Sequence, residues 1–288
     1  MIKHKACKLR LLCLHGMYQN ADTFAAKTKH LRAVTVAGTN AAPHESDEMV
    51  EYIYLNGPFT VTPRILAKQN QQPPSSQGGK SSGSRQRPRC AKTENLFRAW
   101  WRPSGPHQAE PVQLDEDREV LLSFLREQLE ELGDIDGVLG FSQGASLAAW
   151  LCSAQARLEL RWSPKLAVLI GSYVGPQQYA LNSGILPSIN SLHMFGANDH
   201  VISAAKSQAV VDVFTEAQTP GTQVLTSIHG QGHVAPKCDA ALAQFHSFVA
   251  QNVSAAPLSI GNTDDATPNG SATHHQDKPR RQAEELYL

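Results

Sequence analysis

Apolar and polar residues follow one another along this chain in blocks that predict strands and helices in turn. Short, nearly continuous apolar runs predict buried strands at 8–14, 33–37, 135–139, 166–170, 192–195 and 223–228. Apolar positions at helical spacing predict helices between them, at 21–31, 114–132, 144–156, 203–216 and 236–251. Apolar runs without alternation are typical of parallel strands that are covered on both faces. The order therefore predicts an α/β fold, with a mostly parallel central sheet and helices on both faces.

Two polar segments interrupt this pattern. Residues 68–94 and 253–288 are rich in Gln, Ser, Gly and Pro and contain few apolar residues. Because so little apolar burial cannot offset the conformational entropy lost on ordering, we expect both segments to be disordered. The rest of the chain has the length of one domain. We therefore expect a single domain over 1–252, interrupted at about 68–94, and a disordered C-terminal tail over 253–288.

The most informative motif lies between the predicted strand at 135–139 and the helix that follows it. Residues 140–144 read Gly-Phe-Ser-Gln-Gly, a G-x-S-x-G motif. At a strand-to-helix turn this motif forms a nucleophile elbow, in which the serine hydroxyl projects above the sheet. The start of the helix also directs backbone N–H groups and the positive end of its dipole at the same point. Ser142 is therefore the candidate nucleophile.

A nucleophilic serine needs a histidine base and a carboxylate that orients the histidine. At a nucleophile elbow of this kind both follow the serine along the chain, the acid first. Asp199 lies in a loop after one predicted strand, and His233 lies in a glycine-rich loop after the next. His229 is the alternative base, and we favour His233 because it lies deeper in that loop. The predicted catalytic residues are Ser142, Asp199 and His233.

An oxyanion hole needs two backbone N–H donors. One is expected at Gln143, directly after the nucleophile, and the other in the loop after an early strand. That loop begins His15-Gly16-Met17, where the glycine lets a substrate carbonyl come close to the backbone. We therefore predict the N–H groups of Met17 and Gln143 as the oxyanion hole.

Aromatic residues near these motifs are candidates for a substrate pocket. We predict an apolar lining from Tyr18, Phe97, Trp100, Trp101 and Phe141, with Tyr18 near the entrance. The two tryptophans could equally belong to the core, and the sequence leaves this alternative open.

Several of these motifs together resemble a known family. The segments that carry the resemblance are 12–20, 98–101, 140–144, 195–202 and 230–236, in the order found in the family of serine hydrolases with the FSH domain. The resemblance covers about residues 8–250 and implies an α/β-hydrolase fold with Ser142, Asp199 and His233 as its triad. It also implies hydrolysis of carboxylic esters, usually with an acyl-chain preference, and kinship to acyl-protein thioesterases. The polar segment at 68–94 departs from the family pattern near the expected substrate entrance.

Composition excludes several other classes of partner. Lys plus Arg and Asp plus Glu are both 26, so no net charge attracts nucleic acid or an acidic membrane surface. No apolar run approaches the length of a membrane helix, and the run at 11–14 is too short for a signal peptide. The five cysteines are scattered without a C-x-x-C pair, which indicates free thiols in a reducing compartment. We therefore expect a cytoplasmic or nuclear protein that does not insert stably into membranes.

The motifs predict a carboxylesterase-type serine hydrolase. We expect it to act through an acyl-enzyme on a small-molecule ester with an apolar acyl chain. No metal-ligand motif, P-loop or G-x-G-x-x-G motif occurs, so we expect no metal and no cofactor. An acyl thioesterase and a non-catalytic binding protein of the same fold remain alternatives. The acyl length, the leaving group and the oligomeric state stay open.

Overall fold

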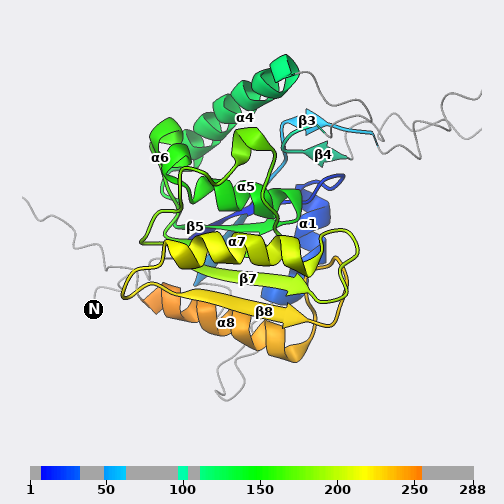
Figure 1. Ribbon diagram of the computed structural model, residues 1–288, viewed down its shortest axis with the longest axis vertical. Coiled ribbons are helices and arrows are strands. Elements are labelled where there is room, and N and C mark those ends of the chain that lie inside the picture. Colours follow the sequence, from blue (N-terminus) through cyan, green and yellow to red (C-terminus); the bar gives the residue numbers. More distant parts are fainter. Residues whose placement is uncertain (1–7, 33–48, 63–96, 103–110, 255–288) are drawn as a thin grey trace, which may run out of the picture. The chain divides into compact units, whose positions relative to one another are not determined.

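One parallel sheet organises the computed structural model, which describes residues 8–32, 49–62, 97–102 and 111–254 (Figure 1). Its six strands lie in the order β2-β1-β5-β6-β7-β8, and every neighbouring pair is parallel. The strands are β1 (Leu9–Leu14), β2 (Val50–Leu55), β5 (Gly137–Phe141), β6 (Leu166–Ile170), β7 (Asn190–Gly196) and β8 (Val224–His229). A separate antiparallel pair is formed by β3 (Phe59–Thr60) and β4 (Arg98–Ala99).

Helices cover both faces of the sheet (Figure 1). One face carries α4 (Pro111–Leu132), α5 (Gln143–Leu151), α6 (Ala154–Leu160) and α7 (Ala204–Glu216). The other face carries α1 (Ala21–Lys27), α2 (Lys29–Arg32) and α8 (Asp239–Ser254). The predicted α/β class, with a parallel sheet and helices on both faces, is confirmed.

The side-chain alternation of the strands explains why both faces are apolar. In β1, Leu12 and Leu14 pack into the core under α5, whereas Leu11 and Cys13 pack into the core under α1 and α8. Such a strand buries every second residue on each side and therefore reads as a continuous apolar run. This buried sheet holds the strand ends, and the loops that follow them, in fixed relative positions.

The structure differs from the sequence predictions at an edge strand and at two helices. The edge strand that pairs with β1 is β2, which the sequence pattern did not predict. The strand predicted at 33–37 lies outside the described residues. The helix predicted at 144–156 is two helices, because α5 ends before Ser153 and the Ser153 hydroxyl accepts the Ala156 N–H to start α6. The helix predicted at 21–31 is likewise divided at Thr28.

Other predictions concern parts of the chain that the structure does not describe. The polar segment at 68–94 and the tail from 255 onward lie outside the described residues.

Within the described part, none of the helices is both long and apolar enough to cross a membrane. Cys13, Cys152 and Cys238 are free thiols. A cytoplasmic or nuclear location stays a prediction from the cysteine pattern.

Candidate active site

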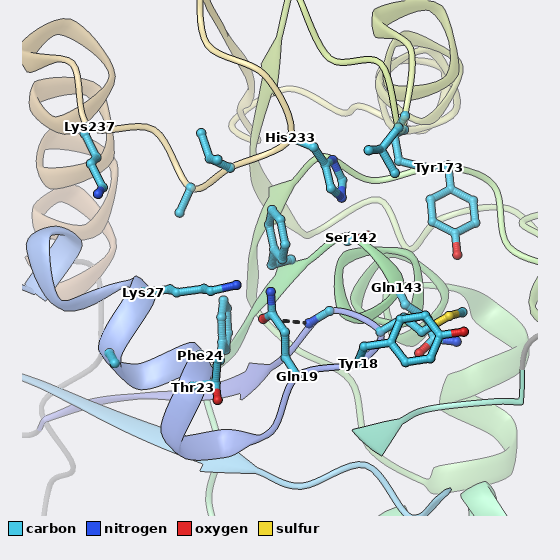
Figure 2. Close-up of a pocket in the computed structure, with 18 of the residues that line it drawn as sticks. Tyr18, Gln19, Thr23, Phe24, Lys27, Ser142, Gln143, Tyr173, His233 and Lys237 are labelled. Carbon is cyan, nitrogen blue, oxygen red and sulfur yellow. Dashed lines mark hydrogen bonds between the residues drawn. The ribbon is translucent and has the colours of Figure 1, made fainter. Parts of the chain in front are cut away.

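The predicted catalytic residues follow three strands of the same sheet. Ser142 comes directly after β5, Asp199 follows β7 and His233 follows β8. Because the carboxyl ends of parallel strands meet at one edge, the loops after these strands gather there. A cleft of about 1020 Å³ at this edge is lined by both Ser142 and His233 (Figure 2).

Ser142 lies at a sharp turn between β5 and α5. Its backbone has φ 54° and ψ −118°, a conformation that residues with a side chain rarely adopt. The Ser142 N–H donates to the Ile170 carbonyl of β6 at 2.8 Å, which anchors the turn to the sheet. Gly144 passes so close to the carbonyls of Leu14 and His15 that a β-carbon there would overlap them. These contacts explain why a G-x-S-x-G sequence is needed at this turn.

His233 and Asp199 form a buried hydrogen-bonded pair. The distance from His233 Nδ1 to Asp199 Oδ2 is 2.6 Å, and the two side chains are 15% and 1% exposed. The other carboxylate oxygen, Oδ1, accepts the N–H groups of Val201 and Ile202, each at 2.8 Å. Because the carboxylate accepts at Nδ1, that nitrogen carries the proton and the Nε2 lone pair is left for another group.

The hydrogen bonds of Asp199 keep it ionised. Burial by itself would raise the pKa of this carboxyl group, since it disfavours the charged form. The hydrogen bonds from Ile202, His233 and Val201 favour the charged form, and together they hold the pKa below its ordinary value. A carboxylate in this position can stabilise an imidazolium at His233.

Ser142 and His233 face the same cleft without a hydrogen bond between them in this structure. Figure 2 shows the His233 ring directed into the cleft that holds Ser142. The ring packs against Phe141, with 4.8 Å between ring centroids. Bonds between a nucleophile and its base are often loose before substrate binds, so this arrangement is compatible with proton transfer.

The alternative base, His229, makes no contact of this kind. It lies at the end of β8 and is buried, and neither ring nitrogen has a hydrogen-bond partner within the described part of the chain. Burial lowers the pKa of His229, so the ring stays neutral at pH 7. Of the two histidines, the structure joins only His233 to Asp199.

The two predicted oxyanion donors border the same cleft. Gln143 is the first residue of α5, so its N–H has no acceptor within the helix. The Gly16 carbonyl is bound by His15 Nδ1 at 2.8 Å and by the Gln19 N–H at 3.1 Å. In a trans peptide the N–H points opposite to the carbonyl, so the Met17 N–H is directed away from these two groups. Met17 lines the cleft, and its N–H has no partner among the described residues.

The His15 side chain holds the Gly16–Met17 loop in place through two hydrogen bonds. Its Nε2 accepts the Gly57 N–H at 2.9 Å, so its proton lies on Nδ1, which donates to the Gly16 carbonyl. Burial lowers the pKa of His15 to about 4, which keeps the ring neutral at pH 7. The neutral ring can then accept on one side and donate on the other, as the loop requires.

Three of the five predicted pocket residues do not line the cleft. Tyr18 and Phe141 do line it. Trp100 is 0% exposed and donates from Nε1 to the His15 carbonyl, and Trp101 is 6% exposed and stacks on Tyr179 at 4.9 Å. Phe97 is half-buried outside the cleft. The alternative that the tryptophans belong to the core is therefore the one the structure supports, because they pack beneath the loops that frame the cleft.

Sequence reasoning missed most of the residues that do line the cleft. Its apolar walls are formed by Phe24, Phe141, Val201, Ile202, Val234 and Ala235. Tyr173 also lines it and follows β6, so its place after a central strand was a usable signal. Of the wall residues, only Phe141 was predicted. Phe24 comes from α1, and the other four come from the same loops as Asp199 and His233, whose apolar residues were not considered as pocket lining. Within the described ranges, no group of His, Cys, Asp and Glu is arranged to hold a metal ion.

Comparisons with known proteins find a matching family model, similar proteins and a similar solved fold. The family model described as "Serine hydrolase (FSH1)" matches residues 4–245. The esterase OVCA2 of Danio rerio is 28% identical over 85% of this chain and 97% of its own length. The human esterase OVCA2 is 31% identical over 79% of this chain and 89% of its own. A solved carboxylesterase from Bacillus cereus shares the fold, with a TM-score of 0.53 and 16% identity over 87% of this chain and 91% of that one.

Proposed function

Because the chain belongs to the FSH1 serine hydrolase family and is an esterase-type hydrolase, we propose that it hydrolyses small-molecule carboxylic esters through an acyl-enzyme at Ser142. The observation that carries the proposal is the hydrogen-bonded pair of Asp199 and His233 in the cleft of an elbow serine. A structural carboxylate–histidine pair would not need a strained serine beside it. The strain at Ser142 and the pair at its side are both explained by nucleophilic catalysis.

In the acylation step His233 acts through Nε2, the ring nitrogen that Asp199 does not bind. As Ser142 Oγ attacks the ester carbonyl carbon, His233 Nε2 takes the hydroxyl proton, and Asp199 stabilises the imidazolium that forms. The carbonyl π electrons move onto oxygen, giving a tetrahedral oxyanion. When the oxyanion collapses, the bond to the alcohol breaks and His233 returns the proton to the leaving oxygen. The acyl group is then left on Ser142.

Deacylation repeats these steps with water. His233 removes a proton from a water molecule, which attacks the acyl carbon and regenerates Ser142 as the acid is released. The N–H groups of Met17 and Gln143 bind the oxyanion in both halves of the reaction, and the N-terminus of α5 adds its dipole. Each such donor is worth about 10²–10³-fold in rate.

The walls of the cleft favour an apolar acyl group. Phe24 and Phe141 stack at 6.4 Å between ring centroids, and Ile202 and Ala235 line the same cleft. Burial of apolar surface contributes about 25 cal/mol per Å², so each methylene placed there adds about 0.8 kcal/mol. We propose that this wall sets the acyl preference, in place of the tryptophans expected from the sequence.

Hydrolysis of p-nitrophenyl butyrate and octanoate by the full chain tests this proposal. Ser142→Ala should lower kcat by about 10⁴-fold or more, because it removes the nucleophile. Ser123→Ala is the matched control, since Ser123 is exposed on α4 away from the cleft. Near-wild-type turnover by folded Ser142→Ala would contradict the proposal. The butyryl thioester, assayed in parallel, separates an esterase from a thioesterase.

A further inference from the structure

The active-site cleft is charged at one end. Lys27, the last residue of α1, and Lys237, two residues before α8, both line it. Figure 2 shows the Lys27 side chain extended along the cleft beside Phe24, with Lys237 reaching in from the opposite segment. No Asp or Glu is among the described residues that line this cleft. The end away from Ser142 therefore carries positive charge without a carboxylate to neutralise it.

Neither lysine has a carboxylate partner among the described residues. The residues one helical turn from Lys27 are Thr23, Phe24, His30 and Leu31, none of them acidic, so no pairing within the helix can form. Within the described ranges, neither lysine lies within ion-pair distance of a carboxylate. The acidic neighbours Asp22 and Asp239 are exposed and do not line the cleft.

Neighbouring contacts hold this end of the cleft in place. His30 donates from Nε2 to the Pro236 carbonyl at 2.8 Å, which ties α2 to the segment that carries Lys237. Burial, and to a lesser degree the charge of Lys237, lowers the pKa of His30, so its ring is neutral. The charge that a ligand meets here comes from the lysines.

Gln19 adds a further hydrogen-bond donor to the lining of the cleft. Gln19 accepts the Gly16 N–H through Oε1 at 3.4 Å and lines the same cleft as Lys27 (Figure 2). Its Nε2 has no hydrogen-bond partner in the part of the chain that the structure describes. The cleft thus combines apolar walls with an amide donor and two ammonium groups, and an anion is the ligand that matches the donor and the positive charge.

We propose that this enzyme prefers esters that carry a second, anionic group, such as a carboxylate, beyond a short apolar spacer, and that Lys27 and Lys237 bind it. The inference rests on the proposed ester hydrolysis at Ser142 and names its substrate class. The spacer contacts the walls at Phe24 and Phe141, and the anion reaches the two ammonium groups. The preference adds charge recognition to the apolar walls already described.

Matched substrates test this preference in the full chain. The first pair is p-nitrophenyl hydrogen suberate and its methyl-capped neutral ester, in which the anion is on the acyl side. The second pair is 4-acetoxybenzoate and its methyl ester, in which the anion is on the leaving side. Wild type should show a kcat/KM ratio of charged to neutral substrate above one for one of the pairs, and 1 M NaCl should reduce that ratio.

Substitutions then assign the preference to the lysines. Lys27→Met and Lys237→Met should each lower the charged-to-neutral ratio by up to about fivefold, the range of exposed ion pairs, and the double variant should abolish the preference. Lys27→Arg should keep it. Lys29→Met is the matched control, because Lys29 is exposed on α2 and does not line the cleft. A wild-type ratio at or below one for both pairs, or a ratio unchanged in the double variant, overturns the proposal.

A binding measurement separates this inference from the proposed function. Isothermal titration of Ser142→Ala with monomethyl suberate and with dimethyl suberate reports charge recognition without turnover. Tighter binding of the monoester that is lost in the double lysine variant supports recognition of the anion by the two lysines, independently of turnover at Ser142. Equal binding of the two esters, together with Ser142-dependent hydrolysis of neutral esters, overturns the inference and leaves the proposed function standing.

Discussion

His233 Nδ1 lies 2.6 Å from Asp199 Oδ2, although 34 residues separate the two in the chain. The second oxygen of the same carboxylate accepts the N–H groups of Val201 and Ile202. Rotation of the Asp199 side chain would therefore break all three hydrogen bonds. The loop after β7 holds the carboxylate rigidly, and the carboxylate in turn fixes which nitrogen of His233 faces the cleft.

Asp199→Asn should lower kcat by about 10³–10⁴-fold. The asparagine oxygen can keep the bonds from Val201 and Ile202, but its NH₂ group then faces His233 Nδ1 and forces the proton onto Nε2. The base would lack its lone pair where Ser142 needs it. The measurement is kcat on p-nitrophenyl butyrate. Asp136→Asn is the control, since Asp136 lies before β5 and pairs with Lys165. A loss below tenfold in Asp199→Asn would contradict the assigned role.

Gly16→Ala should impair activity more than Gly230→Ala. A β-carbon on Gly16 would lie 2.8 Å from Phe141 Cδ1 and 3.3 Å from Ser142 Cβ, so the oxyanion loop would have to move. A β-carbon on Gly230 would meet no atom within 4 Å. We expect kcat/KM to fall by about 100-fold for Gly16→Ala, as for loss of one oxyanion donor. Equal effects of the two substitutions would show that this loop is not part of the site.

Gln143→Ala should destabilise the fold while leaving the Gln143 backbone donor in place. The side chain accepts the Trp100 N–H at 3.0 Å and donates to the Trp101 carbonyl at 2.9 Å, both in buried positions. Removal leaves two buried backbone groups unpaired, at a cost of about 2–4 kcal/mol in the free energy of unfolding. Urea unfolding measures the change. Gln208→Ala is the control, because Gln208 makes an exposed hydrogen bond to Asp212, and it should change the free energy of unfolding by less than about 0.5 kcal/mol. Equal losses in the two variants would refute the role of the Gln143 side chain in joining Trp100 and Trp101.

Stability should fall as the pH drops below neutral. The pKa of His15 is lowered from 6.5 in the unfolded chain to about 4 in the fold, chiefly by burial. The unfolded state therefore binds more protons, so the stabilisation is complete above pH 6.5 and is lost progressively down to about pH 4. This loss is on the order of 3 kcal/mol for His15, and buried His193, with a pKa of about 3, adds to it. Urea unfolding from pH 7 to 4 measures it, and a constant free energy of unfolding would contradict the buried neutral state of both rings.

The sheet could be predicted because its central strands are apolar on both faces. The run Leu166–Ile170 reads as a buried strand without further context, and it is β6. By contrast, β2 contains Glu51 and four half-buried residues at the edge of the sheet, so its apolar signal is weaker. The position of β2 at the edge of the sheet depends on its pairing with β1, and the sequence of β2 alone does not show that pairing.

The order of the catalytic motifs is visible in the sequence because each motif follows a strand of one parallel sheet. Strand order alone therefore predicts that Asp199 and His233 lie at the same edge. The substrate walls could not be predicted in the same way. Trp100 and Trp101 have the character of pocket residues, but their backbone groups bind the Gln143 side chain and their rings fill the core. Such packing depends on contacts between residues about 40 positions apart, for which no local pattern exists.

Labelling with a fluorophosphonate probe tests the central claim most directly, because the probe reacts with an activated serine whatever the natural ester. Wild type should be labelled at Ser142, identified by mass spectrometry of the modified peptide, and Ser142→Ala should not be labelled. Asp199→Asn should be labelled far more slowly than wild type. Absence of labelling in well-folded wild type, or labelling that persists in Ser142→Ala, would contradict an activated nucleophile at Ser142.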